Sequence, residues 1–244
     1  MWHMPDTATC DAGPPRPSTP MPSDPRPRRE KPRLRGVSHQ LAAIAAVPAV
    51  YWLVTSAPSG PARTGATVYG ATLVALLSVS TFYHRVYWPS SIRHVIGRVD
   101  HSAIFLLIAG TYTPFCLLLG PGAGRNLLVS VWIAASLGIL LVVFWPGMPK
   151  KLRSALYVLL GWFVFPTLPA LHAALGDGAL LLLFAGGFFY TVGAVIYAIR
   201  RPDPFPRVFG FHEIFHLFVI AAAVCHFFVV VTAIRALATV SAAH

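Results

Sequence analysis

Charged side chains are scarce in this 244-residue sequence, and acidic ones are the scarcest. Only 8 Asp and Glu residues stand beside 19 Lys and Arg, and charged residues make up 11% of the chain. Soluble globular domains carry about 25% charged residues. With 56% hydrophobic residues and a mean hydropathy of +0.65, the composition excludes an ordinary soluble domain and indicates an integral membrane protein.

Cysteine is equally sparse, and its spacing excludes two further classes of site. The three cysteines, Cys10, Cys116 and Cys225, are far apart in the sequence. Neither a disulfide framework nor a thiolate metal site is indicated. The net charge of +11 does not indicate a nucleic-acid partner, because the basic residues gather in the first 36 residues and between apolar runs.

Residues 1–36 differ in composition from the rest of the chain. They carry nine prolines and seven basic residues with no apolar period, so we expect a disordered cytoplasmic tail preceding one membrane domain over residues 37–244. Its basic cluster RPRREKPRLR either rests on anionic lipid or only fixes the orientation of the chain.

Seven apolar segments follow the tail, and we predict an all-α bundle of seven transmembrane helices. Each is long enough for a membrane helix, and none alternates as a barrel strand does. Between them, one set of loops carries nine Lys and Arg and the other carries three, which predicts a cytoplasmic N-terminus and a C-terminus outside. The segments span about 37–56, 67–87, 99–119, 126–145, 152–172, 178–199 and 212–234.

Polar residues within these segments gather at one membrane depth on the cytoplasmic side. Ionisable residues inside spans are functional candidates by default. Three histidines there, His84, His212 and His216, provide the ligand set of an open zinc site. We expect Asp100 to hydrogen-bond a water or ligand at that site, and Ser80 to orient His84 or a substrate.

Other histidines are expected to lie elsewhere. His39, at the start of the first segment, either supports the metal ligands from behind or, as we favour, is an interfacial residue. His101 is predicted to point about 100° away from Asp100 on its helix. His226 lies too deep for the same ion and is predicted to pair with a hydroxyl group of the bundle.

The residues from His212 to His216 match the H-E-x-x-H pattern of zinc peptidases, in which the glutamate is the general base. Asp100 offers a second carboxylate for that role, and the third histidine lies upstream rather than downstream. We therefore favour Asp100 as the base and expect Glu213 to face the interface or a basic loop residue such as Arg207.

These motifs resemble the hemolysin III proteins, bacterial members of the progestin and adipoQ receptor superfamily, which is related to alkaline ceramidases. The resemblance implies seven spans and an intramembrane zinc on the cytoplasmic side, with ligands His84, His212 and His216 and with Asp100 and Ser80 adjacent. In the receptor relatives, glutamine can stand at the position of Glu213. The first segment matches less well, because residues 34–38 read LRGVS where bacterial relatives often carry acidic and Asn residues. The resembling stretches are STFYHR (80–85), VDHSAIFLLIAGTYTPF (99–115), LYVLLGW (156–162), AGGFFYTVGAVIYAIRRPDPFP (185–206) and FHEIFHLFVIAAAVCHFF (211–228).

Two classes of function follow for a multi-pass protein of the cell membrane. The first is a zinc-dependent hydrolase that acts on the amide or ester bond of a membrane lipid, with Asp100 accepting the proton. The second is a receptor-like regulator of membrane lipid state in which zinc is structural. A pore-forming hemolysin is less favoured, because seven apolar spans with an inside-positive pattern describe a resident membrane protein.

Overall fold

The computed structural model describes residues 31–242. The expected tail over residues 1–36 therefore lies mostly outside the described residues. Within them, regular secondary structure is helical apart from one isolated bridge between Phe205 and Phe209, which confirms the all-α prediction. The two cysteines in this part of the chain, Cys116 and Cys225, are both free thiols.

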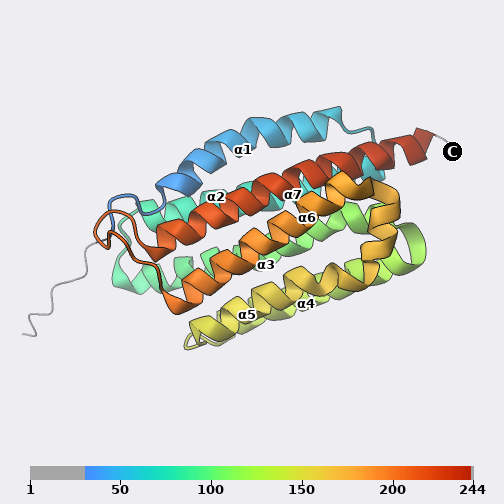
Figure 1. Ribbon diagram of the computed structural model, residues 1–244. Helices are drawn as coiled ribbons and strands as arrows, with labels where there is room; N and C mark the ends of the chain where they lie inside the picture. The colour runs from blue at the N-terminus through green and yellow to red at the C-terminus, as the bar shows by residue number, and fades with distance from the viewer. Residues whose placement is uncertain (1–30, 243–244) are drawn as a thin grey trace, which may run out of the picture. The chain divides into compact units, whose positions relative to one another are not determined.

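Seven α-helices and two short irregular helices follow one another along the chain (Figure 1). Six helical stretches are long and apolar enough to cross a membrane. The helices are α1 (Val37–Ser56), α2 (Pro61–Arg85), α3 (Ser90–Leu118), the π-helical η1 (Gly120–Gly124), α4 (Arg125–Phe144), α5 (Lys150–Gly161), the 3₁₀-helical η2 (Trp162–Thr167), α6 (Leu168–Ile199) and α7 (Phe211–Ala242). The count of membrane-length stretches is one lower than expected, because α5, η2 and α6 follow one another without a loop and count as one helical stretch, Lys150–Ile199, of 50 residues.

Helices α2 and α3 begin well before the starts that the apolar pattern predicts. Helix α2 begins at Pro61, whose fixed φ and missing N–H suit the first helical position. Helix α3 begins at Ser90 instead of near residue 99, because helical hydrogen bonding does not need apolar side chains. Asp100 therefore lies about three turns inside α3 and not at its start.

Small residues allow neighbouring helices to approach closely. A Cβ atom at Gly110 of α3 would collide with Thr72 of α2, and one at Gly186 of α6 would collide with the ring of His226 on α7. Without a hydrophobic driving force between helices in lipid, such close packing contributes much of the association.

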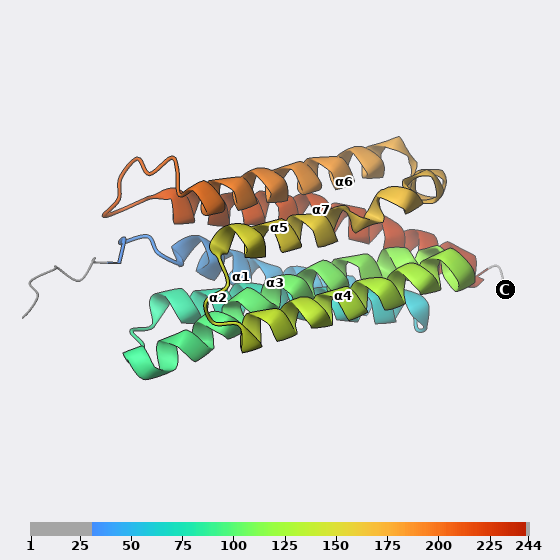
Figure 2. The same cartoon turned by 90° about the horizontal axis from the view of Figure 1, so that it is seen from below.

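Residues 31–36, which we call the strap, lie against the loop before α7 (Figures 1 and 2). The backbone N–H of Arg33 donates to Arg207 O at 3.0 Å, and that of Leu34 donates to Val208 O at 3.2 Å. Lys31 Nζ donates to Val86 O, just beyond the end of α2, at 3.0 Å. We call this end of the helices, where the strap and the loop before α7 meet, the strap end.

Candidate metal centre

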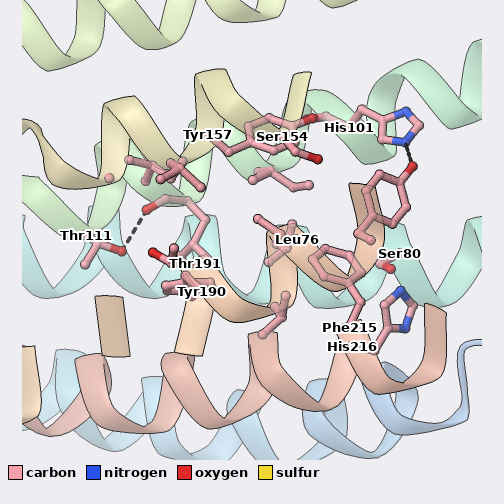
Figure 3. Close-up of a pocket in the computed structure, with 18 of the residues that line it drawn as sticks. Leu76, Ser80, His101, Thr111, Ser154, Tyr157, Tyr190, Thr191, Phe215 and His216 are labelled. Carbon is pink, nitrogen blue, oxygen red and sulfur yellow. Dashed lines mark hydrogen bonds between the residues drawn. The ribbon is translucent and has the colours of Figure 1, made fainter. Parts of the chain in front are cut away.

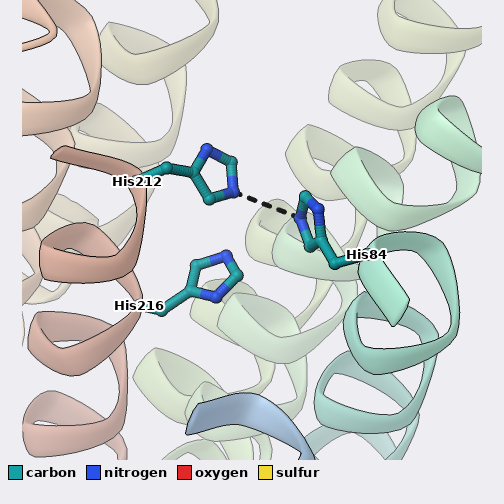
Figure 4. A group of neighbouring side chains, drawn as sticks. All are labelled: His84, His212 and His216. Atoms are coloured by element: carbon teal, nitrogen blue, oxygen red, sulfur yellow. Dashed lines mark hydrogen bonds between the residues drawn. The ribbon is translucent and has the colours of Figure 1, made fainter. Parts of the chain in front are cut away.

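Three histidines from two helices meet at the strap end (Figure 4). His84 lies on the last turn of α2, and His212 and His216 lie one turn apart at the start of α7. One ring nitrogen from each lies within 4.8 Å of the others, and the Nε2 atoms of His84 and His212 are 3.1 Å apart. The structure thus brings together the three residues that the sequence pattern singled out.

The chemistry of this cluster fits a metal ion that prefers nitrogen ligands. Three neutral imidazoles are the protein ligands of open zinc sites. His216 is buried, and its Nδ1 atom has no hydrogen-bond partner among the described residues. Buried polar atoms normally have a partner. Imidazole donors without thiolates favour zinc or a similar transition metal over magnesium or calcium.

Asp100 stands beside this cluster as the sequence predicted. Its Oδ2 atom lies 3.9 Å from His84 Nε2, and only 8% of the residue is exposed. Asp100 also lines a cavity together with Ser80, His212 and His216. A carboxylate therefore lies beside one of the three imidazoles and in the wall of the cavity.

His39 belongs to this cluster, and its prediction as an interfacial residue is wrong. Its ring stacks on that of His216, with centroids 3.8 Å apart and planes at 9°. His39 Nδ1 is hydrogen-bonded to Ser80 Oγ at 2.8 Å, and the residue is 3% exposed. Ser80 therefore contacts His39 and not His84, and its alternative role of orienting a substrate stays a prediction. Ser80 was selected because it lies at the same membrane depth as the three histidines. The same criterion would also have selected His39.

Glu213 is paired with a basic residue outside the helices, as expected, but that residue is Arg35 and not Arg207. Its carboxylate forms an ion pair with Arg35 of the strap and accepts a hydrogen bond from the backbone N–H of Gly210 at 2.8 Å. Gly210 immediately precedes α7, so this bond satisfies an amide that the helix itself leaves unpaired. The contacts of Glu213 are thus those of a helix-capping residue, and Arg207 contributes only its backbone carbonyl to the strap.

Positive charge is concentrated around the strap. Partial burial, with Arg93 and Arg35 nearby, lowers the pKa of Lys31 from its usual value. Within residues 31–242, Arg35 is the cation that pairs with the carboxylate of Glu213. The ion pair therefore neutralises one of several cations at this end of the protein.

Replacing either partner of the ion pair should destabilise the start of α7. We expect Arg35→Gln or Glu213→Gln to lower the thermal transition of the purified protein by about 3–10 °C, because each leaves a charged group without its partner. In a double-mutant cycle, the double variant should be little less stable than the worse single variant. Arg33→Gln is the matched control, since its side chain is exposed and its contact to the loop is through the backbone. If the double variant instead lost the sum of the two single losses in stability, Arg35 and Glu213 would not interact directly.

The other two inward histidines have other neighbours. His101 lines the same cavity as Asp100, but its Nε2 lies 3.5 Å from the hydroxyl of Tyr197, whereas Asp100 lies beside His84. The prediction that His226 pairs with a hydroxyl group is wrong, because its Nε2 lies 3.3 Å from the backbone oxygen of Leu183.

An apolar cavity of about 130 Å³ leads from the histidine cluster into the bundle (Figure 3). Side chains of α2, α3, α5, α6 and α7 line it, among them Leu107, Ile108 and Val219. Its deeper part reaches Trp162 and His226. One water needs only about 10–15 Å³ of such volume, so the cavity has room for a larger apolar group.

Comparison with known proteins shows what this chain resembles. A family model described as "Haemolysin-III related" matches residues 28–227. The chain is 35% identical to "Hemolysin-3" of Bacillus cereus over 199 residues, which cover 80% of this chain and 87% of the relative. It is 34% identical to the "Hemolysin-3 homolog" of Bacillus subtilis (strain 168) over 200 residues, 80% of this chain and 90% of that protein. The human "Monocyte to macrophage differentiation factor" is 32% identical over 171 residues, 68% of each chain.

Proposed function

Since this chain belongs to the hemolysin III family of multi-pass membrane proteins, we propose that it is a zinc-dependent hydrolase of a lipid amide or ester bond in the cell membrane. The observation that carries this proposal is the placement of the histidine cluster and Asp100 at one end of an apolar cavity. A lipid needs such a cavity for its chain, and hydrolysis needs a proton acceptor beside the scissile bond.

We also propose that the helices make seven spans. A helix of 50 residues would be about 75 Å long, more than twice the thickness of a bilayer core. Arg153, near the start of α5, donates a hydrogen bond to the hydroxyl of Tyr197, near the end of α6, at 3.1 Å. This contact supports a reversal of the chain between them, and the non-helical φ of 77° at Gly176 supplies a break. The loop charges favour the cytoplasm for the strap end.

The topology has a direct test in reporter fusions. A reporter fused after residue 244 is expected to be active outside the cytoplasm, and one inserted near Lys150 is expected to be active in the cytoplasm, because basic loops are retained inside. Six spans would instead put both termini of the membrane domain on one side. A cytoplasmic reporter signal from residue 244 would therefore refute the seven-span arrangement.

In this proposal His84, His212 and His216 hold the zinc ion. When bound, zinc polarises a carbonyl group and lowers the pKa of water. Asp100 Oδ2 accepts a proton from water and returns it to the leaving group. His39, held by Ser80 and stacked on His216, fixes the orientation of that ring. The apolar lining of the cavity excludes bulk water and receives a lipid chain.

The likeness to the human protein favours a second candidate. Its name denotes an effect on cell differentiation and not a reaction. The second candidate is a receptor-like regulator of membrane lipid state, in which the same three histidines hold a structural zinc.

Turnover of defined lipids separates the two candidates. The purified, zinc-loaded chain is incubated with a ceramide and with a matched fatty acyl ester, and released fatty acid is measured before and after zinc is removed by a chelator. Fatty acid release that needs zinc supports the hydrolase. A zinc-loaded protein without turnover of either lipid would support the regulator.

A further inference from the structure

His226 is an ionisable side chain near the middle of α7, a helix that is apolar enough to cross a membrane. It lies nearly three turns beyond His216 and lines the deeper part of the cavity. Ionisable residues inside spans are costly and are functional candidates by default. His226 does not belong to the group formed by His84, His212 and His216. The metal centre therefore does not account for this histidine.

The ring of His226 is held against α6 by one of its edges. A Cβ atom at Gly186 would collide with Cδ2 and Nε2 of the ring, so this glycine leaves room for that edge. Leu183 O can only accept a hydrogen bond, so the Nε2 atom 3.3 Å from it carries the ring proton. In a neutral imidazole the other nitrogen, Nδ1, is then an acceptor. Because Nδ1 lies opposite the bond between Cδ2 and Nε2, the edge that points away from Gly186 presents this acceptor.

No hydroxyl group of residues 31–242 is hydrogen-bonded to the Nδ1 atom. Tyr190 is a neighbour with a hydroxyl, and its ring centroid lies 5.4 Å from that of His226, but no hydrogen bond joins the two. The hydroxyls of Thr111 and Thr191 donate to carbonyl oxygens one turn back in their own helices. Figure 3 shows these three residues at the end of the cavity opposite His216. This end of the cavity therefore offers a free acceptor to a molecule that fills it.

We infer that the deep end of the cavity recognises a hydroxyl group on the chain of a bound lipid, with His226 Nδ1 as the acceptor. A hydroxyl matches because it donates a proton, whereas a carbonyl oxygen only accepts one. The inference rests on the proposed function, since the amide or ester bond beside the histidine cluster sets where the chain begins. It adds the substrate class, which is lipids with hydroxylated acyl chains.

Helix geometry gives the position of the hydroxyl on the chain. His226 is ten residues beyond His216, which is about 15 Å along α7. An extended saturated chain advances about 1.3 Å per carbon, given C–C bonds of about 1.5 Å and tetrahedral angles. A hydroxyl that meets His226 is therefore about 12 carbons from the reacting carbonyl group.

The affinities of positional isomers test the inference on the unmodified protein. The full chain as purified, in an uncharged detergent, is titrated calorimetrically with octadecanoate, 3-hydroxyoctadecanoate and 12-hydroxyoctadecanoate, which share one head group and contain no bond to hydrolyse. After correction for partitioning into protein-free micelles, we expect the 12-hydroxy acid to bind about fivefold more tightly than the other two, as one neutral hydrogen bond provides. A 12-hydroxy acid that binds no more tightly than either of the others, as for a histidine satisfied by water, would overturn the inference.

Three variants assign the preference to His226. His226→Asn places an amide oxygen as many bonds from the backbone as Nδ1 and should keep most of the preference. His226→Leu has no acceptor, so the preference should be reversed, with the 12-hydroxy acid bound at least about fivefold more weakly than octadecanoate, because its buried hydroxyl would lack a partner. Thr111→Val is the matched control: it removes a cavity-lining hydroxyl that already donates to Leu107 O at 2.8 Å, and should change the preference less than about twofold.

The ratio of the two affinities does not depend on how much of a variant is folded, and micelle partitioning is the same for every variant. An unchanged preference in His226→Leu, or a loss in Thr111→Val equal to that in His226→Leu, would refute the role of His226.

The two proposals fail separately. A preference for the 12-hydroxy acid without fatty acid release from the ceramide or the acyl ester would leave the deep site in place and remove the hydrolase. Zinc-dependent release of fatty acid without that preference would leave the hydrolase and remove the deep site.

Discussion

Alanine at any one of His84, His212 or His216 is expected to remove most of the zinc from the purified protein. The wild type should carry about one zinc per chain, since three imidazoles complete one site. Loss of a residue that only supports a ligand costs about 10–100-fold in metal affinity, so loss of a ligand should cost at least that. Metal analysis after gel filtration should find occupancy below about one tenth in each variant.

His226→Ala is the control for that measurement. Its ring lines the same cavity but lies beside Leu183 O, and it is not part of the group formed by His84, His212 and His216. We therefore expect full zinc occupancy in this variant. A wild type without zinc, or a loss in His226→Ala equal to that in His216→Ala, would refute the metal centre.

Asp100→Asn is expected to abolish hydrolysis while zinc remains bound. Asparagine keeps the size of the side chain but cannot accept the proton, and loss of a general base costs about 10²–10⁴-fold in rate. His84, His212 and His216 are unchanged in this variant, so zinc content should match the wild type. The measurement is fatty acid release from whichever of the two lipids, the ceramide or the acyl ester, the wild type hydrolyses. Zinc is determined on the same sample.

Glu213→Gln is the matched carboxylate control. If the H-E-x-x-H pattern described a peptidase-type base, this change would abolish activity with the metal in place. Because the carboxylate of Glu213 is paired with Arg35 and Gly210, we expect a rate within about tenfold of wild type and a lower thermal stability. An inactive Glu213→Gln beside an active Asp100→Asn would reverse the assignment.

The sequence by itself determined the helical class and singled out the three histidines that the structure brings together. Apolar runs of membrane length leave few alternatives to helices, since backbone groups in lipid need internal partners. His84 and Asp100 flank the same loop, and His212 and His216 are one turn apart, so topology alone predicts one depth for all four. The sequence predicted the ends of helices less accurately. Helix α3, for example, includes polar residues that precede the apolar segment and that a hydropathy pattern does not assign to a helix.

The tertiary structure alone decided which side chains touch within that depth. The contact of His39 with Ser80 spans 41 residues, and that of Arg35 with Glu213 spans 178. Such contacts depend on the rotation of each helix about its axis and on close packing at glycines such as Gly110. Neither helix rotation nor close packing can be predicted from the hydrophobic period of a single segment, because all the neighbours of a helix together set its rotation. For the same reason, the cavity becomes visible only when the helices are assembled.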